Sequence, residues 1–292
     1  MYLKLRNTCL LILALAGILV AGGSAMAQKP GKKKTDTPIT RESAMLAKIF
    51  FKYHDMEALS QKIHGKMIIH TGGLTIDVDI ESTVTASQPN KFHIASKVNF
   101  LGDEKRGSVF SDGKNIWDVD EDAKEYSLLP ADSVIKDSDK FTDWLMDRVG
   151  MDMTLLFFLK AANSDDFGVP KGVEKAELDK MLDVKNYPTK EVDGTKMYLV
   201  PVPLDEKDPT KKGQVMVLYV DTKDFLIRRI SLKMKIGDEK DPKDKDSMEM
   251  VMNYDAIKPG VKVTDGDLTF LPPDGTKKVE MVKPVFSRAF DK

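Results

Sequence analysis

The sequence predicts a mainly β protein of the α+β class. We expect one large curved antiparallel sheet, or incomplete β-barrel, with helices on its concave face as plug and lid. Residues Leu74–Glu81 alternate between apolar and polar side chains, which is typical of a strand with one buried and one solvated face. Short apolar runs, separated by Gly, Asp and Asn turns, continue on both sides of this stretch. Strands and helices do not alternate as they do in parallel βαβ folds, so the pattern favours an antiparallel meander.

The first residues of the chain, Met1–Ala27, are predicted to be a cleavable secretory signal. Two basic residues precede the apolar run Leu10–Ala21, and the small residues Ala25 and Ala27 form the cleavage site. The apolar run is shorter than the roughly 20 residues that a membrane-spanning helix needs. We therefore expect a periplasmic or otherwise exported protein, cleaved after Ala27, with no transmembrane segment after cleavage. The single cysteine, Cys9, would be removed with the signal.

Residues 28–39 are predicted to be a flexible leader, and residues 40–292 a single β domain. The leader is rich in Pro, Gly, Lys and Thr and has no apolar periodicity. Charged residues make up 31% of the chain, with both signs interleaved and a formal net charge of −1. This balance argues against the basic surface of a nucleic-acid-binding protein, so no nucleic-acid partner is expected.

An amphipathic helix is predicted from Thr40, the expected N-cap, to about Leu59, because apolar residues recur there at helical spacing. The period then changes to two, and the pair Gly72-Gly73 predicts a tight hairpin turn. The predicted strands of the first half are Lys66–Thr71, Leu74–Glu81, Phe92–Leu101, Ser108–Ser111, Asn115–Val119 and Glu125–Leu129.

Helical candidates interrupt the strands in the middle of the chain, and a second set of strands follows. The helical candidates are Phe141–Val149, Thr154–Ala162 and Glu174–Leu182. The later strands are predicted at Val184–Val192, Lys196–Val202, Gln214–Val220, Leu226–Ile236 and Ser247–Ile257. A charged loop is predicted between the last two strands, at Asp238–Asp246.

Methionines gather on one face of the last two predicted strands. Met248, Met250 and Met252 lie on one side of the last strand, and Met234 lies among apolar residues on one side of the strand before it. Methionine is unbranched and polarizable, so a face built from it can conform to flexible apolar ligands. The alternative is that these methionines fill an ordinary core.

The helical candidate near Leu155–Leu159 is apolar on nearly every side. In an exported soluble protein, such a segment is either deeply buried or a lid over an apolar cavity. We predict a lid that carries Leu155, Phe157 and Phe158 and covers a cavity lined by the four methionines.

Three short motifs resemble the LolA/LolB-like lipoprotein-sorting superfamily. The first is the hairpin Ser111–Pro130, with a DG turn, an aromatic residue, a Tyr and a Pro. The second is the pair of strands Leu218–Asp221 and Ile227–Ile230, and the third is the ending Phe270–Val279. They occur in the expected order along the chain. The nearest match is a periplasmic branch of unknown function.

This resemblance implies an incomplete β-barrel around a helix, with an apolar cavity for a lipid or for lipoprotein acyl chains. It adds Trp117, in the first motif, to the cavity candidates. It also implies a strand arginine that controls the lid, for which Arg228 and Arg229 are the candidates. Related folds act as sensors of mislocalised envelope lipids or lipoproteins, so an envelope protein is a second kind of partner.

Candidate catalytic or metal-ligating residues are few. The four histidines have no HExxH spacing and no cysteine partners, so no zinc site is expected. Asp118, Asp120 and Asp122 have the spacing of a calcium loop, but Ala123 and Leu129 stand where its glycine and bidentate Glu belong. We interpret these three as turn carboxylates. A serine elbow and a phosphate-binding loop are also missing from the sequence.

The favoured function is therefore a carrier-like exported binding protein for apolar ligands, without catalysis, metal or cofactor. The first alternative is a non-catalytic envelope sensor or interaction module of the same fold. The second is an envelope hydrolase, for which Glu81 and the Asp-rich turns provide no specific support.

Overall fold

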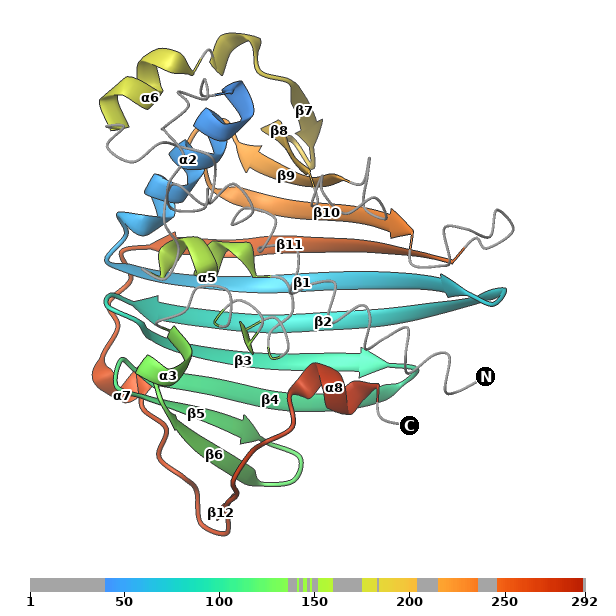
Figure 1. The fold of residues 1–292 in the computed structure, drawn as a ribbon, viewed down its shortest axis with the longest axis vertical. Coiled ribbons are helices and arrows are strands. Elements are labelled where there is room, and N and C mark those ends of the chain that lie inside the picture. Colours follow the sequence, from blue (N-terminus) through green and yellow to red (C-terminus); the bar gives the residue numbers. More distant parts are fainter. Residues whose placement is uncertain are drawn as a thin grey trace, which may run out of the picture.

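A computed structural model describes residues 40–135, 141, 144–145, 148, 152–159, 175–182, 184–203, 215–235 and 246–290. One twelve-stranded sheet organises them, in the order β12-β6-β5-β4-β3-β2-β1-β11-β10-β9-β8-β7 (Figure 1). The strands are β1 Ala58–Thr71, β2 Leu74–Ser87, β3 Lys91–Phe100, β4 Asp103–Asp112, β5 Asn115–Asp120, β6 Glu125–Pro130, β7 Thr189–Val192, β8 Thr195–Pro203, β9 Val215–Asp221, β10 Ile227–Lys235, β11 Ser247–Pro259 and β12 Lys277–Lys278. The helices are α2 Arg41–His54, α3 Asp132–Ile135, α5 Met153–Phe158, α6 Lys175–Met181, the 3₁₀ turn Val184–Asn186, α7 Asp265–Leu268 and α8 Val285–Ala289.

Two antiparallel meanders, β1–β6 and β7–β11, join along the centre of the sheet. Strand β1 pairs with β2 on one side and with β11 on the other. Strand β12 is parallel to its neighbour β6, while the other neighbouring pairs are antiparallel. The predicted meander is confirmed, and the hairpin turn at Gly72-Gly73 lies where the sequence predicts it, with positive φ at both glycines.

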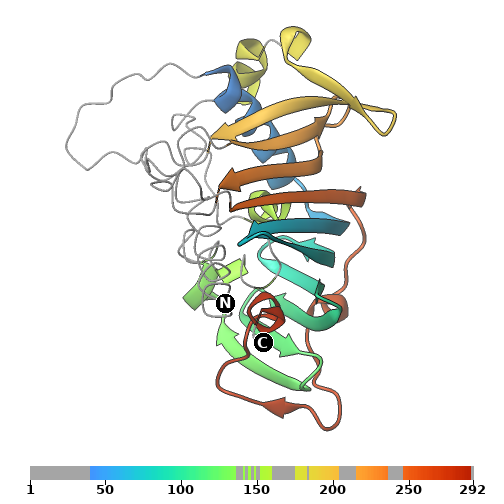
Figure 2. The same cartoon turned by 90° about the vertical axis from the view of Figure 1, so that its right-hand side faces the viewer.

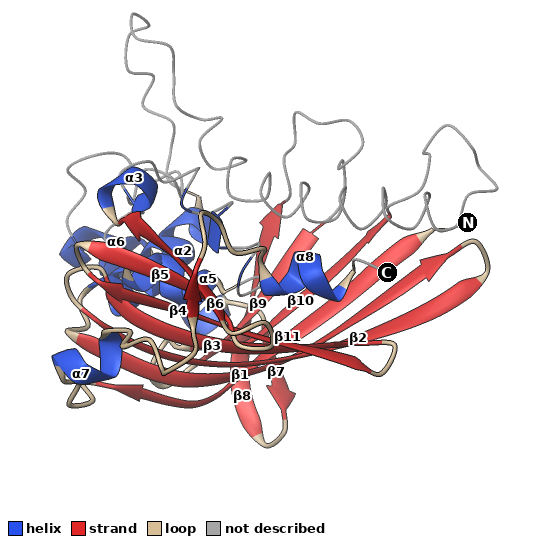
Figure 3. Cartoon of the chain, turned by 90° about the horizontal axis from the view of Figure 1, so that it is seen from below, coloured by secondary structure: helices blue, strands red, loops and turns tan. Residues whose placement is uncertain are grey.

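The sheet is curved, and α2, α3, α5 and α8 lie on its concave side (Figure 3). We call the concave side the inner face and the convex side the outer face. Along β1 the inner-face residues Ile63, Met67 and Ile69 are buried, and the outer-face residues Lys62 and His64 are exposed. The predicted fold class, a curved antiparallel sheet with helices on its concave face, is thus confirmed.

Helix α2 begins as predicted but ends five residues earlier. The hydroxyl of Thr40 accepts a hydrogen bond from the backbone N–H of Ser43 at 3.1 Å, which caps the helix. Helix α2 ends at His54, and Leu59 already belongs to β1, where it is completely buried. The prediction extended too far because the apolar residues between helix and strand continue the helical spacing by chance.

The other boundaries differ for local reasons. Val184–Val192 is not one strand, because a 3₁₀ turn occupies Val184–Asn186 and Pro188 separates it from β7. Helix α5 ends at Phe158, and its C-cap Leu159 has extended backbone angles. The signal, the leader and most of the predicted loop Asp238–Asp246 lie outside the described residues.

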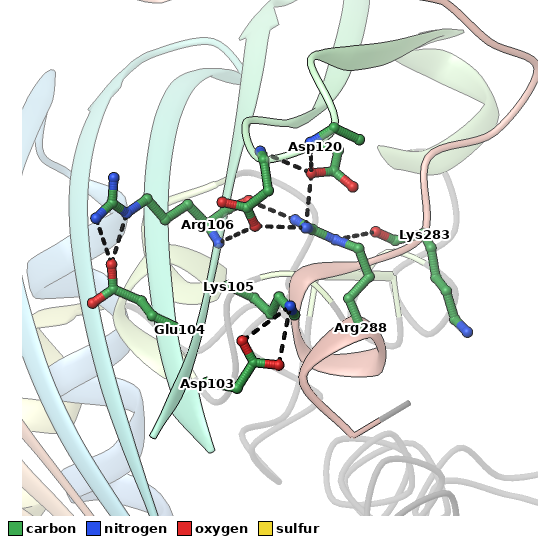
Figure 4. Close-up of polar contacts among 9 residues, drawn as sticks. Asp103, Glu104, Lys105, Arg106, Asp120, Lys283 and Arg288 are labelled. Atoms are coloured by element: carbon green, nitrogen blue, oxygen red, sulfur yellow. Dashed lines mark hydrogen bonds and ion pairs between the residues drawn. The ribbon is translucent and has the colours of Figure 1, made fainter. Parts of the chain in front are cut away.

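The C-terminal segment wraps around the β6 edge of the sheet. From α7, on the outer side, the chain passes β12 beside β6 and reaches α8 on the inner face (Figures 1 and 2). Arg288 of α8 contacts Asp120 at 2.8 Å and Asp122 at 3.0 Å, and donates to the carbonyl oxygens of Arg106 and Lys283 (Figure 4). Gly107 permits this approach, because a Cβ there would lie 3.2 Å from the Arg288 guanidinium.

Candidate functional site

A cluster of buried methionines lies on the inner face, across the centre of the sheet. Met234 pairs with Met248, and Met250 lies between Leu232 and Met67 in the cross-strand register. All members of this methionine patch are between 0 and 6% exposed: Met67, Met216, Met234, Met248, Met250 and Met252. The predicted grouping of the four methionines on one face is present in the structure.

Met67 and Met216 join the patch through the strand register, although the sequence pattern did not identify them. Each is a single methionine in its own strand, so only strand pairing reveals that it joins the others. Gly65 of β1 makes room for Met252, because a Cβ at Gly65 would lie 2.3 Å from the Met252 sulfur. The packing of the patch therefore depends on the glycine at position 65 as well as on the six flexible methionine side chains.

Helix α5 carries the three predicted lid residues, and they are buried. Leu155, Phe157 and Phe158 are at most 1% exposed, and Phe157 lies 6.3 Å, ring to ring, from both Phe50 and Tyr53 of α2. These edge and tilted ring contacts fix α5 against α2 on the concave side of the sheet (Figure 1).

The N-terminal end of α5 is anchored to the sheet by a buried polar cluster. Asp152 caps the helix, accepting from the N–H groups of Thr154 at 3.0 Å and Leu155 at 3.2 Å. The Gln61 side-chain amide of β1 donates to both Asp152 oxygens, at 3.1 and 3.3 Å, and to the Thr154 hydroxyl at 2.5 Å. Burial raises the pKa of the Asp152 carboxyl, and these donors counteract only part of that rise.

The C-terminal end of α5 is anchored by a second glutamine. The Gln88 side-chain amide, just after β2, donates to the Phe158 carbonyl at 2.5 Å. The Oε1 atoms of Gln61 and Gln88 are both buried and have no hydrogen-bond partner in the described part of the chain. A six-residue helix is thus held at both ends by side-chain amides that remain only partly satisfied.

Helix α5 and the methionine patch share the inner face but occupy different parts of it. Gln61, beneath α5, precedes Gly65 by four residues and Ile69 by eight, which is about 13 and 26 Å along the strand. Helix α5 is only about 9 Å long, so the far end of the patch lies beyond it. The expectation that the patch lies directly under this helix is therefore corrected: the two are neighbours along β1.

A buried ion pair links the helical insert to the sheet. Arg148 contacts Asp118 of β5 at 2.5 Å, stacks over Trp144 at 4.4 Å, and donates to the Trp144 carbonyl at 3.1 Å. Both side chains of the pair are at most 8% exposed. Burial raises the pKa of the Asp118 carboxyl, while the neighbouring guanidinium groups of Arg148 and Arg288 act in the opposite direction.

The partners of the two strand arginines proposed from the resemblance, as far as the described residues show, lie outside the insert. Arg228 pairs with Asp221 at 3.3 Å and with Asp224 at 2.5 Å, within its own turn. Arg229 pairs with Asp193 at 3.0 Å, on the outer side. The structure instead shows the reverse arrangement, in which the insert provides the arginine and the strand provides the carboxylate.

The three aspartates of the apparent calcium loop are engaged by protein groups. Asp118 pairs with Arg148, and Asp120 and Asp122 pair with Arg288. Asp120 also accepts from the N–H groups of its own turn, as its interpretation as a turn carboxylate predicts. Among the described residues, no group of three or more His, Cys, Asp or Glu side chains could hold a metal ion.

Trp117 lies on the outer face and is separate from the other candidates. It pairs with Phe110 in β4 and is flanked in β5 by the inner-face residues Ile116 and Asp118. On this face Phe270, from the third motif, packs against Phe110 at 5.3 Å and Tyr126 at 5.4 Å. The motifs around Trp117 thus attach the C-terminal segment to the outer face, and Trp117 cannot line the inner one.

An open hollow of about 360 Å³ lies on the outer face of β1–β4. Charged side chains surround it, among them Lys97 and Arg106. Lys97 pairs with Glu81 at 2.8 Å, and Arg106 pairs with Glu104 at 2.6 Å. The hollow is polar and is separated from the methionine patch by the sheet itself.

Within the described stretches, no helix is both long and apolar enough to cross a membrane.

The solved structures that resemble this fold are remote. An uncharacterized conserved protein from Thermus thermophilus has 11% identity and a TM-score of 0.42, covering 82% of this chain and 99% of its own. A LolA superfamily protein from Nitrosomonas europaea has 10% identity and a TM-score of 0.26, covering 80% and 99%. LprF from Mycobacterium bovis has 10% identity and a TM-score of 0.30, covering 77% and 94%.

The comparison with curated proteins found no match. A family model described as predicted periplasmic protein (DUF2092) matches residues 67–282, from β1 through the C-terminal segment. The predicted assignment to a periplasmic branch of unknown function is thereby confirmed, and the chain belongs to the DUF2092 family of predicted periplasmic proteins.

Proposed function

We propose that this protein is an exported, non-catalytic binding protein for apolar ligands, either a lipid or the acyl chains of a lipoprotein. The observation that carries the proposal is the methionine patch beside α5. Six adaptable apolar side chains cover a continuous area of the inner face, next to a short helix whose described side chains are all buried. Such a surface can adapt to the shape of an acyl chain at little cost in apolar burial.

Helix α5 is the element best suited to move. An isolated helix of six residues is far below the length that is stable in water, so α5 depends on its contacts with α2 and on its two glutamine anchors. Strand β1 pairs with β2 along its whole length and with β11 from Leu59 to His70, apart from a register shift at Gln61. Displacing α5 would break its contacts with α2 and its two glutamine anchors, leave the sheet intact, and open the inner face next to the methionine patch.

Two observations support a periplasmic location for the protein. The family is described as predicted periplasmic, and the first 27 residues carry the features of a cleavable signal. We propose that the mature protein starts at Gln28 and acts in the periplasm as a single β domain.

The second candidate function is an envelope sensor or interaction module that has filled its inner face with side chains. The low exposure of every methionine in the patch favours it. The two functions differ in one measurable property, which is saturable binding of an apolar probe.

The test is a titration of the full mature chain with N-phenyl-1-naphthylamine, an uncharged probe that fluoresces in apolar surroundings. The binding function predicts saturable fluorescence, and Phe157→Asp should weaken it because a charge would enter an apolar site. Leu271→Asp adds the same charge at a side chain that is 81% exposed, and should leave binding unchanged. A flat titration of a folded wild-type protein would reject the binding function and favour the interaction module.

A further inference from the structure

The polar cluster beneath α5 restricts the chemistry of a ligand that could bind there. Gln61 is 1% exposed and lies on the inner face between Leu59 and Ile63, which are both completely buried. Its cross-strand neighbour in β2 is Val84, also buried. Gln61 and the two residues it contacts in the insert, Asp152 and Thr154, therefore form a polar spot in an otherwise apolar region.

This polar spot has an excess of hydrogen-bond acceptors. The Gln61 amide nitrogen and the Thr154 hydroxyl and N–H all donate to Asp152. The Gln61 Oε1 atom is left buried, with no partner in the described part of the chain. An amide oxygen buried in this way costs free energy until a donor reaches it. The spot therefore needs a hydrogen-bond donor and has no use for a further acceptor.

Among the described residues, no positive charge lies at this spot either. The two well-buried arginines of the inner face, Arg148 and Arg288, are engaged by Asp118 and by Asp120 and Asp122. No ion pair joins Asp152 to a basic side chain within the described stretches, and the Asp152 side chain is almost completely buried. A carboxylate or phosphate placed beside Asp152 would meet an acidic group in a site of low polarity, which is unfavourable.

We propose that the head group of the bound lipid is uncharged and donates hydrogen bonds, as the hydroxyls of a monoacylglycerol or the N–H of an acyl amide do. The head group reaches the Gln61 spot when the C-terminal end of α5 moves away while Asp152 and Thr154 keep their contacts with Gln61. The acyl chain extends along β1 over the methionine patch. The site discriminates against the free fatty acid anion. This inference rests on the proposed binding function and names the class of ligand for it.

The experiment compares three ligands with the same twelve-carbon chain as competitors of N-phenyl-1-naphthylamine: monolaurin, methyl laurate and laurate, at pH 7.4. Monolaurin has donors and no charge, methyl laurate has neither donor nor charge, and laurate is an anion. We expect monolaurin to compete about tenfold more strongly than methyl laurate, since one buried hydrogen bond is gained. Laurate should be the weakest competitor of the three.

Two variants test whether Gln61 is responsible for the preference among the three ligands. Gln61→Met keeps the length of the side chain and removes its whole amide, both the unpaired Oε1 and the Nε2 that donates to Asp152 and Thr154. Without that Oε1 acceptor, the preference for monolaurin over methyl laurate should fall to about one. Met67→Leu, in the methionine patch, should change the affinity for all three ligands together and leave their ratio unaltered. If Gln61→Met does not fold, the order of the three ligands on the wild-type protein still decides the question.

The outcomes separate the two proposals. If the probe binds and laurate competes as well as monolaurin, the head-group inference is wrong while the binding function stands. If the probe binds and methyl laurate equals monolaurin, the donor requirement is wrong. If the probe does not bind at all, the binding function fails, and the head-group inference fails with it.

Discussion

Asp152 shows how a single residue can make the anchoring of helix α5 depend on pH. Its carboxyl is buried, caps α5, and accepts from the Gln61 amide of the sheet. Burial is the largest cause of its shifted pKa, which lies above the ordinary value near 4. A raised folded-state pKa means that the folded protein binds this proton more tightly than the unfolded chain does. The stabilising contribution of Asp152 is complete below its unfolded pKa and is lost as pH rises through the folded pKa.

Asp152→Asn should therefore remove a pH-dependent cost. The asparagine Oδ1 can still accept from the N–H groups of Thr154 and Leu155, and its Nδ2 can donate to Gln61 Oε1 if that amide turns over. The free energy of unfolding of the variant, relative to wild type, should increase from about pH 4 upward, as measured by urea denaturation at several pH values. A difference that stays constant with pH would show that Asp152 does not carry a raised pKa.

The residue scale also shows what the sequence could predict. The burial of Leu155, Phe157 and Phe158 and the shared face of the four methionines follow from local apolar patterns. The pairing of Asp118 with Arg148 does not, because the two residues are thirty positions apart and only the folded insert brings them together. The motif alone places Trp117 among the cavity candidates, although its alternation with Ile116 already puts it opposite the buried face.

At the scale of elements, α5 and β1 should differ in local stability although they touch. Helix α5 has six residues, two glutamine anchors and aromatic contacts with α2, whereas β1 pairs along both edges. Local opening follows such differences in contacts. Hydrogen exchange should therefore be faster at the amides of Leu156 and Leu159, which close the turns of α5, than at Ile63 or Met67.

The same experiment contains its control. Monolaurin should change exchange in α5 and leave the central amides of β3, which lie away from the proposed site, unaffected. If α5 exchanges only through global unfolding, at the same rate as β1, then it does not open separately and cannot serve as a lid.

Elements with a clear period were predicted well, including the six-residue strands β5 and β6, whereas the shortest elements were not. The strands of the two meanders follow the alternation of side chains, as β3 shows along its whole length. Strand β12 has two exposed residues and pairs in parallel with β6, so it leaves no period in the sequence. Helices α7 and α8 have four and five residues, too few for a helical repeat.

At the scale of the whole molecule, two arginines tie distant parts of the chain to the same strand. Arg148 joins the helical insert to β5 through Asp118, and Arg288 joins the C-terminal helix α8 to the end of β5 through Asp120. Both pairs lie on the inner face, so the cover of the sheet is attached to β5 by charges as well as by apolar contacts. This attachment explains why the Asp-rich hairpin has carboxylates pointing inward.

The Arg148–Asp118 pair provides the sharpest test of this attachment. Removing one partner should leave a buried charge unpaired, so Arg148→Met should lower the free energy of unfolding by about 3 to 5 kcal/mol. The double variant Arg148→Met with Asp118→Leu removes both charges and should recover much of this loss, because apolar side chains replace a pair that was costly to desolvate. Urea denaturation of the four proteins in this cycle measures the coupling. Simple additivity of the two single losses would mean that the pair does not hold the insert on the sheet. Recovery of stability, together with stronger binding of N-phenyl-1-naphthylamine by the double variant, would mean that the ion pair holds the insert closed over the inner face at a cost to ligand access.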